Sequence, residues 1–284
     1  KTWTTGVPPV GTGETPVLQG EEKKLVSSPP AGEANRVDDL QLVDNGDGTR
    51  SFHWHISYPI TTYLLMVSIS NYQSFTDWYV TAEGDSMPIV NYVYPEHFDN
   101  AVEDLSVVVE GMEYYVSLFG EYPFINEKYG HSIFPWGGGM EHQTNTSLGS
   151  MLIRGDHTYD FIFVHELSHM WFGDMISPDA WAEVWMNEGF AVFSEFLFTE
   201  IFSGENAAKN YRHSTMNSYF SSGENFPMFD PDVYLSYTCY NRAAMVVNML
   251  RFLMGDSTFF DAVRNYTEHF KYKTVTHDSL KTVL

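Results

Sequence analysis

The stretch FIFVHELSHMWFGD at residues 161–174 constrains this chain most, because it carries two histidines four positions apart with a glutamate directly after the first. On a helix, residues i and i+4 lie on one face about 6 Å apart along the axis, so His165 and His169 can direct both imidazoles at one metal ion. Glu166 is rotated by about 100° from His165, where it can contact a water on that ion without being a ligand. The pattern predicts a zinc-binding helix rather than an ordinary buried helix that carries polar residues.

A catalytic zinc also needs a third protein ligand and an open position for water. The segment WAEVWMNEGFAVFSEF supplies Glu188 on the next predicted helix, at a separation from His169 that lets one helix end and a second pack beside it. Apolar neighbours argue against a solvated carboxylate there, because an unpaired buried carboxylate is costly. Glu195, two turns further on, is predicted to orient a ligating imidazole, and Asp174 is a second candidate for that role.

Two of these motifs, VHELSHMWFGD and WMNEGFA, resemble those of the gluzincin metallo-aminopeptidases, the group that includes aminopeptidase N and leukotriene hydrolase. Upstream, GGGMEH resembles the Gly-x-Met-Glu-Asn exopeptidase motif of that family. The three motifs occur in the family order. The resemblance runs from about residue 37 to the end of the chain, whereas residues 1–35 match nothing in the family pattern.

The resemblance implies a zinc aminopeptidase that removes N-terminal residues from peptides. One Zn²⁺ per chain would be held by His165, His169 and Glu188, with Glu166 as the general base. Glu141 would hold the free α-amino group of the substrate, and a carboxylate is a suitable partner for an ammonium. The expected substrates are therefore peptides with a free N-terminus.

The glycine-rich stretch before Glu141 has a matching role in the family. The resemblance implies that Gly138 and Gly139 offer backbone groups to the peptide and that Met140 lines the first substrate pocket. A glycine run also lets a substrate backbone approach closely. The alternative is a glycine-rich loop beside a surface acid. His142 departs from the family pattern, which has Asn there, and this change leaves the charge of Glu141 in place.

A tyrosine that stabilises the oxyanion is also implied by the resemblance. The segment DVYLSYTCYNRAAMVVNML resembles the Tyr-x-Lys-Gly helix start of the family, which makes Tyr240 the match, although Asn-Arg-Ala stands where x-Lys-Gly is usual. Tyr237 and Tyr234 are rivals for the role. Cys239 is interpreted as a packing residue without a redox task.

The N-terminal part of the chain is predicted to be β structure. Residues 1–35 are rich in Gly, Pro, Ser and Thr and read as loops. VDDLQLV and RSFHWHISY alternate around the turn sequence DNGDG, which predicts a hairpin, and TTYLLMVSIS and SFTDWYVTA read as two further strands. Residues 1–86 are therefore interpreted as the C-terminal part of an N-terminal antiparallel β domain.

Residues 87–284 are interpreted as a thermolysin-like zinc peptidase catalytic domain, so that the fold class is α+β. HFDNAVEDLSVVVEGMEYYVSLFG predicts a helix that ends at Gly120, and GHSIFPW and MLIRG predict short strands. Five later helices are expected, at 159–173, 184–202, 205–221, 239–254 and 257–271. The chain starts without Met and stops within a predicted helix start, SLKTVL. We therefore expect a fragment that lacks the C-terminal helical domain of the family.

Composition excludes several classes of partner and site. The chain has 15 Lys and Arg against 37 Asp and Glu, a formal charge of -22, which argues against binding to nucleic acid or anionic membranes. Its single cysteine excludes an intrachain disulfide and a thiolate-rich metal site. No apolar run reaches the roughly 18 residues of a membrane span. Nothing in the sequence specifies a compartment.

The remaining histidines are assigned no metal. His53 and His55 alternate on a predicted strand, but no third ligand lies near them in the sequence. The others are interpreted as surface or hydrogen-bonded structural residues: His97, His131, His157, His213, His269 and His277.

Three other functions are compatible with part of the pattern. A thermolysin-like endopeptidase shares H-E-x-x-H and a distant glutamate, but it gives no reason for GGGMEH. A relative with epoxide hydrolase activity would share the motifs, although no residue here demands that chemistry. An inactive zinc-binding scaffold or binding module is the alternative from another class, and the retention of Glu166 and Tyr240 argues against it.

Overall fold

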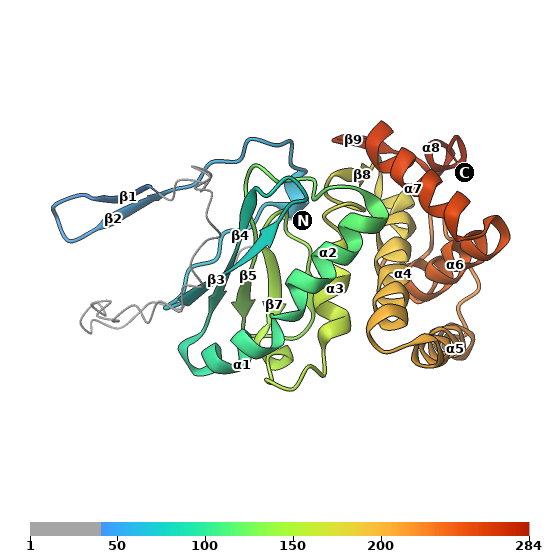
Figure 1. Ribbon diagram of the computed structural model, residues 1–284, viewed down its shortest axis with the longest axis horizontal. Helices are drawn as coiled ribbons and strands as arrows, with labels where there is room; N and C mark the ends of the chain where they lie inside the picture. Colours follow the sequence, from blue (N-terminus) through green and yellow to red (C-terminus); the bar gives the residue numbers. More distant parts are fainter. Residues whose placement is uncertain (1–40, 284) are drawn as a thin grey trace.

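The computed structural model describes residues 41–283, so the predicted loop-rich segment 1–35 lies outside the described residues. A mixed five-stranded sheet forms one side of the molecule, with the strand order β3-β4-β5-β7-β6 (Figure 1). Its strands are β3 (Gln73–Val80), β4 (Ser86–Val93), β5 (Tyr129–Phe134), β6 (Gly139–Met140) and β7 (Thr146–Gly149). The pairs β4–β5 and β5–β7 are parallel, whereas β3–β4 and β6–β7 are antiparallel.

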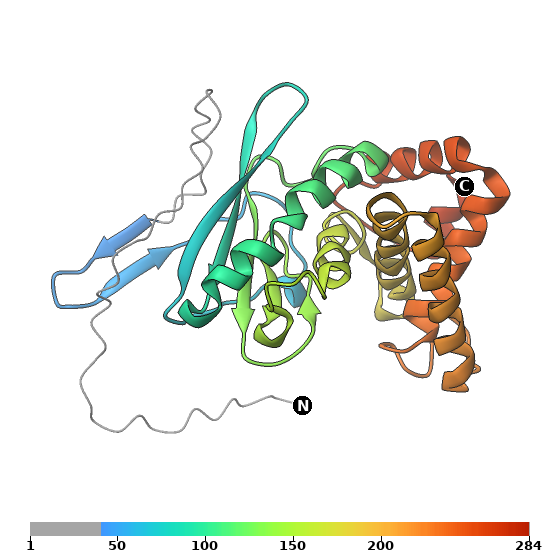
Figure 2. The same ribbon diagram turned by 60° about the horizontal axis from the view of Figure 1, so that its bottom comes forward.

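Helices build the rest of the molecule. They are α1 (Phe98–Asp104), α2 (Val107–Phe119), α3 (Asp160–Ser168), α4 (Trp185–Phe202), α5 (Glu205–Ser222), α6 (Ala243–Met254), α7 (Asp256–His269) and α8 (His277–Lys281). α3 lies between the sheet and α4, and it contacts both α4 and β6 (Figure 2). Helices α5 to α7 pack beyond α4. This arrangement of a mixed sheet and segregated helices is α+β, as predicted.

A continuous apolar core joins the sheet to the helices. Aromatic side chains dominate its centre, and Trp171, Tyr115 and Phe119 are almost fully buried and contact one another edge to face or stacked. Aromatic pairs of this kind add specific packing to the area that they bury. Trp171 lies three residues after the end of α3, so the core fixes the segment that follows this helix. No helix in the described part of the chain has the length and apolar character to cross a membrane.

The predicted hairpin is confirmed. β1 (Gln41–Asp44) and β2 (Arg50–His53) pair antiparallel, with Asp44 opposite Arg50 on either side of the predicted turn. The hairpin extends away from the rest of the molecule (Figure 1). The strand predicted at SFTDWYVTA is β3, and it pairs with β4 in the main sheet. The expected domain boundary near residue 86 falls at the first residue of β4, and the division of the chain there stays a prediction.

Two strand predictions were wrong, and the strands missed include β4, β6 and the parallel pair β8 (Ile176–Pro178) and β9 (Lys273–Val275). TTYLLMVSIS forms a 3-10 turn at Thr62–Leu64 and then irregular chain. Its apolar residues after Leu64 have the alternation of a strand, but no neighbouring strand pairs with them among the described residues. MLIRG contains the 3-10 turn Ser150–Leu152 instead of a strand, since β7 ends just before it. β4 was missed because most of its side chains are buried, so that its sequence shows no alternation.

The helix predictions hold with small changes. The helix expected before Gly120 is two helices, α1 and α2, interrupted at Leu105 and Ser106. α3 ends at Ser168 rather than at residue 173, and tight turns follow it. The predicted helices at 184–202, 205–221 and 257–271 correspond to α4, α5 and α7 within one or two residues.

Candidate metal centre

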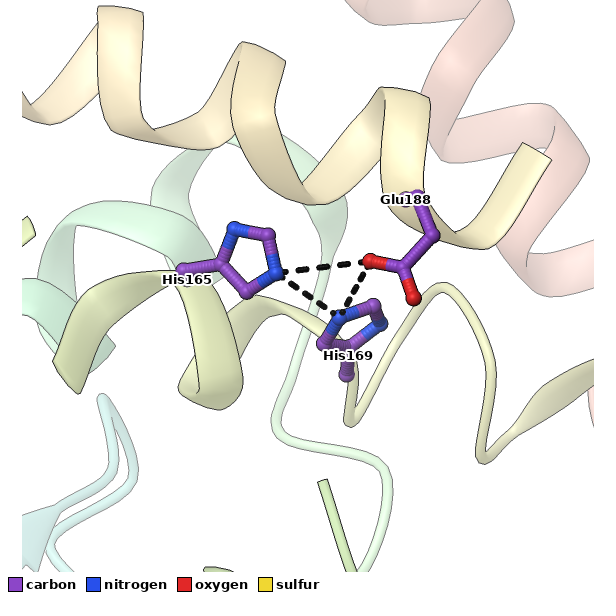
Figure 3. A group of neighbouring side chains, drawn as sticks. All are labelled: His165, His169 and Glu188. Carbon is purple, nitrogen blue, oxygen red and sulfur yellow. Dashed lines mark hydrogen bonds and ion pairs between the residues drawn. The ribbon is translucent and has the colours of Figure 1, made fainter. Parts of the chain in front are cut away.

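Three side chains from α3 and α4 converge on one point (Figure 3). The Nε2 atoms of His165 and His169 lie 3.2 Å apart, and Glu188 Oε2 lies 3.5 Å from the first and 3.4 Å from the second. Ligands of a tetrahedral zinc at bond lengths near 2.1 Å are separated by about 3.4 Å. The three atoms therefore have the spacing of a tetrahedral metal site.

The hydrogen bonds of the two histidines leave their Nε2 atoms available to a cation. His165 Nδ1 lies 2.7 Å from Glu195 Oε1, and His169 Nδ1 lies 3.0 Å from the carbonyl oxygen of Phe172. Both partners are acceptors, so both Nδ1 atoms carry the proton and the neutral rings present bare Nε2 lone pairs. Glu188 Oε2 is buried and makes no hydrogen bond in the described part of the chain. A metal ion satisfies all three acceptors, so these residues fit zinc.

Glu195 lies where the sequence predicted a partner for an imidazole. It is seven residues after Glu188, on the same face of α4, and contacts the far side of His165. The phenol of Tyr211, on α5, donates a hydrogen bond to the other oxygen of Glu195. Such outer partners fix the tautomer and orientation of a ligand. Asp174 contacts no ligand through its side chain: its buried carboxylate has no partner among the described residues, and burial raises its pKa.

Tyr240 reaches the same centre from a π-helical turn at Thr238–Arg242, just before α6. Its hydroxyl donates a hydrogen bond of 2.7 Å to Glu188 Oε1, and its ring is stacked at 6.2 Å against that of His165. Burial and the charge of Glu188 raise its pKa, which keeps the phenol protonated. The rivals Tyr237 and Tyr234 are 48 % and 41 % exposed. π-Helical turns are often found at functional sites.

Close contact between two helices positions this tyrosine. At Gly189, next to the ligand Glu188, an added Cβ would lie only 2.7 Å from the Cβ of Ala243. α4 and the start of α6 therefore approach more closely than any larger residue at position 189 would permit. The short distance between the helices brings Tyr240 within hydrogen-bonding reach of Glu188.

Two further carboxylates stand beside the ligands. One carboxylate oxygen of Glu141, one of Glu166 and a ring nitrogen of His169 lie within 4.8 Å of one another. Burial raises the pKa of Glu166 to about 7, and the charges of Glu141 and Glu188 add to the effect while the two histidines oppose it. A carboxyl with a pKa in this range can both accept and donate a proton near neutral pH.

The glycine stretch borders the same carboxylates. Gly139 and Met140 form β6, the edge strand of the sheet, which pairs on one side with β7. A side chain at Gly139 would collide with the carboxylate of Glu166, so a larger residue there would displace that carboxylate from its present position. Gly138 accepts a hydrogen bond from the N–H of Gly149 through its carbonyl. The other edge of β6 can pair with an extended peptide.

The model of the Peptidase family M1 domain matches residues 134–284, more than half of the 284 residues. The chain belongs to peptidase family M1. The resemblance to the zinc aminopeptidases is thus confirmed at the level of the family. The match covers β6, all three candidate ligands and Tyr240.

Individual relatives agree with the family. The chain is 28 % identical over 249 residues to aminopeptidase B of Mus musculus, covering 80 % of this chain and 36 % of the relative. It is 26 % identical over 268 residues to endoplasmic reticulum aminopeptidase 1 of Mus musculus, covering 85 % and 28 %. The chain thus spans about a third of the length of the curated relatives that it matches.

Solved structures share the fold. The M1 zinc metallopeptidase of Deinococcus radiodurans superposes with a TM-score of 0.69 at 20 % identity, over 86 % of this chain and 54 % of that one. Legionella pneumophila aminopeptidase A, in complex with aspartic acid, gives a TM-score of 0.74 at 19 % identity, over 86 % and 30 %. These M1 neighbours confirm the α+β fold class.

The M1 site contains residues that the sequence did not reveal. The hydroxyl of Tyr63 accepts a hydrogen bond of 3.4 Å from Asn187 Nδ2, and its ring packs 5.1 Å from that of Trp181. Burial and then the charge of Glu141 raise the pKa of Tyr63. Its segment was predicted to be a strand, so nothing in the sequence directed Tyr63 at the site. Tyr211 was missed because a helix prediction does not say which face meets the metal ligands.

The other histidines of this M1 chain lie outside the ligand group. His131 is fully buried, its Nδ1 donates a hydrogen bond of 2.7 Å to Asn91 Oδ1, and burial lowers its pKa to about 3. His142 lies next to Glu141 and contacts Ser147 Oγ at 3.0 Å. In the described part of the chain, neither joins a potential metal-binding cluster.

Proposed function

We propose that this chain is the catalytic part of a zinc-dependent aminopeptidase that removes N-terminal residues from peptides. One observation carries the proposal: three ligand atoms, from His165, His169 and Glu188, have the spacing of a tetrahedral metal site and lie next to two further carboxylates, Glu166 and Glu141. Family membership and the zinc metallopeptidases among the structural neighbours support the choice of metal.

The chemistry divides among the residues of the site. Bound zinc lowers the pKa of water and polarises the scissile carbonyl. Glu166 takes the proton of the attacking water and delivers it to the leaving amine, a task that suits a carboxyl with a pKa of about 7. Tyr240, kept protonated by its raised pKa, donates a hydrogen bond to the oxyanion that forms as water attacks.

Glu141 gives the reaction its exopeptidase character. Its carboxylate makes no hydrogen bond or ion pair with the described residues, and it is close to Glu166. An unpaired carboxylate attracts an ammonium group, and the free N-terminus of a peptide provides one. Only one residue then fits between Glu141 and the scissile bond. Peptides with a free N-terminus are therefore the proposed substrates.

A neighbouring structure is consistent with this substrate class. An M1 zinc metallopeptidase mutant from Deinococcus radiodurans has been solved bound to a Tyr-Ser-Ala substrate. In the present chain, a cavity of about 480 Å³ opens beside His165 and Tyr240 and is bordered by Phe161 and Val192. This cavity provides room for the peptide beyond the scissile bond. A thermolysin-like endopeptidase would have no use for the carboxylate of Glu141.

The decisive test pairs metal analysis with turnover. We expect about one zinc per chain by elemental analysis and release of p-nitroaniline from leucine p-nitroanilide, abolished by a chelator and restored by zinc. Zinc without turnover would favour the inactive module. Efficient cleavage of internal bonds in N-acetylated peptides would favour the endopeptidase. A protein without zinc would contradict the proposed aminopeptidase as well as these two alternatives.

A further inference from the structure

The loop that carries Glu141 has a conformation that its sequence does not favour. Residues 141–145 connect β6 to β7, and Thr144 within them has φ of +61°. A β-branched residue rarely adopts this left-handed region, and it persists there only where surrounding contacts hold it. One backbone hydrogen bond of 2.9 Å, from Asn145 N–H to His142 O, closes the turn. Other contacts must therefore hold the strained residue in place.

The side chain of Lys128 provides two of these contacts. Its Nζ donates hydrogen bonds to the carbonyl oxygen of Thr144 at 3.1 Å and to Asn145 Oδ1 at 3.3 Å. Asn145 Nδ2 in turn donates to Ser132 Oγ of β5 at 2.7 Å. Lys128 directly precedes β5 and is 9 % exposed, whereas lysine ammonium groups normally stay in water. The loop is thus fastened to the central strand of the sheet.

The same turn also contacts the segment that carries the metal ligands. The backbone N–H of Thr144 points at the Sδ atom of Met170 at 3.4 Å, and Met170 is fully buried directly after His169. Glu141, three residues before Thr144, has a carboxylate oxygen within 4.8 Å of those of Glu166. The conformation of the loop therefore sets where Glu141 stands relative to the base and the ligand.

We propose that Lys128 and Thr144 form a latch that fixes Glu141 for recognition of the substrate ammonium. This inference rests on the proposed aminopeptidase function and assigns positioning residues to it. Neither side chain touches the substrate. Loss of the latch lets Glu141 move, which weakens the hold on the amine, while Glu166 and the ligands on α3 and α4 keep their places. The effect is expected in KM and in selectivity for amines, with zinc content unchanged.

The test compares two substrates that differ only in the amine. Lys128→Met keeps the aliphatic stem and removes the donors, and Lys209→Met, at an exposed position on α5, is the matched control. The zinc-loaded variants are assayed with leucine p-nitroanilide and with 4-methylpentanoyl p-nitroanilide, which lacks the amino group, and are titrated with leucinamide by calorimetry. We expect the preference for the amine to fall about tenfold or more in Lys128→Met, mainly through KM, and to be unchanged in the control. Lys128→Arg should restore part of it.

A second variant keeps the test informative if Lys128→Met does not fold. Asn145→Ala removes one of the two acceptors of Lys128 Nζ and the hydrogen bond to Ser132 Oγ, but it leaves the lysine its bond to the carbonyl oxygen of Thr144, so the protein should fold and still show a lower preference for the amine. A folded Lys128→Met or Asn145→Ala protein with the wild-type preference overturns the latch. A wild-type protein that does not distinguish the two substrates contradicts the proposed function instead.

Discussion

The phenol of Tyr240 donates a hydrogen bond to Glu188 Oε1 at 2.7 Å, while Oε2 of the same carboxylate faces His165 and His169. One carboxylate thus connects the proposed oxyanion donor to the proposed metal ligands. Tyr240→Phe should retain zinc, because all three proposed ligand side chains remain, and should lose roughly 100-fold to 1,000-fold in kcat, because a donor to the oxyanion is removed. Steady-state kinetics and elemental analysis measure both. Tyr237→Phe, at an exposed ring, is the control, and a larger loss in that variant would reassign the role.

Replacement of the proposed base, Glu166, separates the chemical step from metal binding. Glu166→Gln keeps the shape of the side chain but cannot accept the proton of water, so kcat should fall by about 100-fold to 10,000-fold. Zinc content should remain at the wild-type value, because Glu166 is outside the group of three candidate ligands. Near-normal turnover in this variant would show that another group acts as the base.

The partner of His165 should control metal affinity. In Glu195→Gln the hydrogen-bonded carboxylate is lost, and zinc affinity should fall by about 10-fold to 100-fold. Competition with a chromogenic chelator measures the dissociation constant directly. Tyr211→Phe removes the hydrogen bond to the far oxygen of Glu195 and should have a smaller effect in the same direction. Glu110→Gln, at an exposed position on α2, is the control, and equal effects at Glu110 and Glu195 would rule out the orienting role.

Removal of the amine anchor should act on one substrate class. Glu141→Ala should lower kcat/KM for leucine p-nitroanilide by about 100-fold, because the ammonium loses a charge-assisted partner. The des-amino substrate 4-methylpentanoyl p-nitroanilide should be affected far less. Equal damage to both substrates would mean that Glu141 supports the site in another way.

The buried His131 predicts a dependence of stability on pH. Its folded-state pKa is about 3, below its ordinary value of 6.5, so the unfolded chain binds a proton that the folded chain excludes. Stability from this group is complete above pH 6.5 and is lost as the pH falls towards 3, at up to about 1.4 kcal/mol per pH unit. Urea unfolding between pH 7 and 4.5 should show a shallower loss for His131→Gln than for the wild type. His213→Gln, at an exposed histidine, is the control, and the same slope in both variants would contradict the assignment.

The sequence predicted those contacts of the site that follow from the spacing of residues along a single helix. His165 and His169 are neighbours on a helix by spacing alone, and Glu195 follows Glu188 by two turns of one helix, so its orienting contact could be anticipated. Tyr240 came only through the resemblance, because the π-helical turn that aims it at Glu188 has no sequence signal.

Contacts between distant segments could not be predicted in the same way. Tyr63, Lys128 and Tyr211 come from a turn, the start of a strand and another helix, and each meets the site through tertiary packing. The error at TTYLLMVSIS has the same cause. Apolar residues there looked like a strand, but a strand needs a neighbour for its backbone groups, and pairing partners are not visible in one segment.

The contact between Gly189 and Ala243 couples the architecture to the chemistry. At most positions the effect of an added methyl group on thermal stability can be measured without any change in catalysis. Here an added methyl group at position 189 would push the start of α6 away from α4, and with it Tyr240 away from Glu188. Thermal stability and turnover would therefore change together. An engineer who wants a more robust form of this protein should leave position 189 untouched and work on the distant hairpin of β1 and β2 instead.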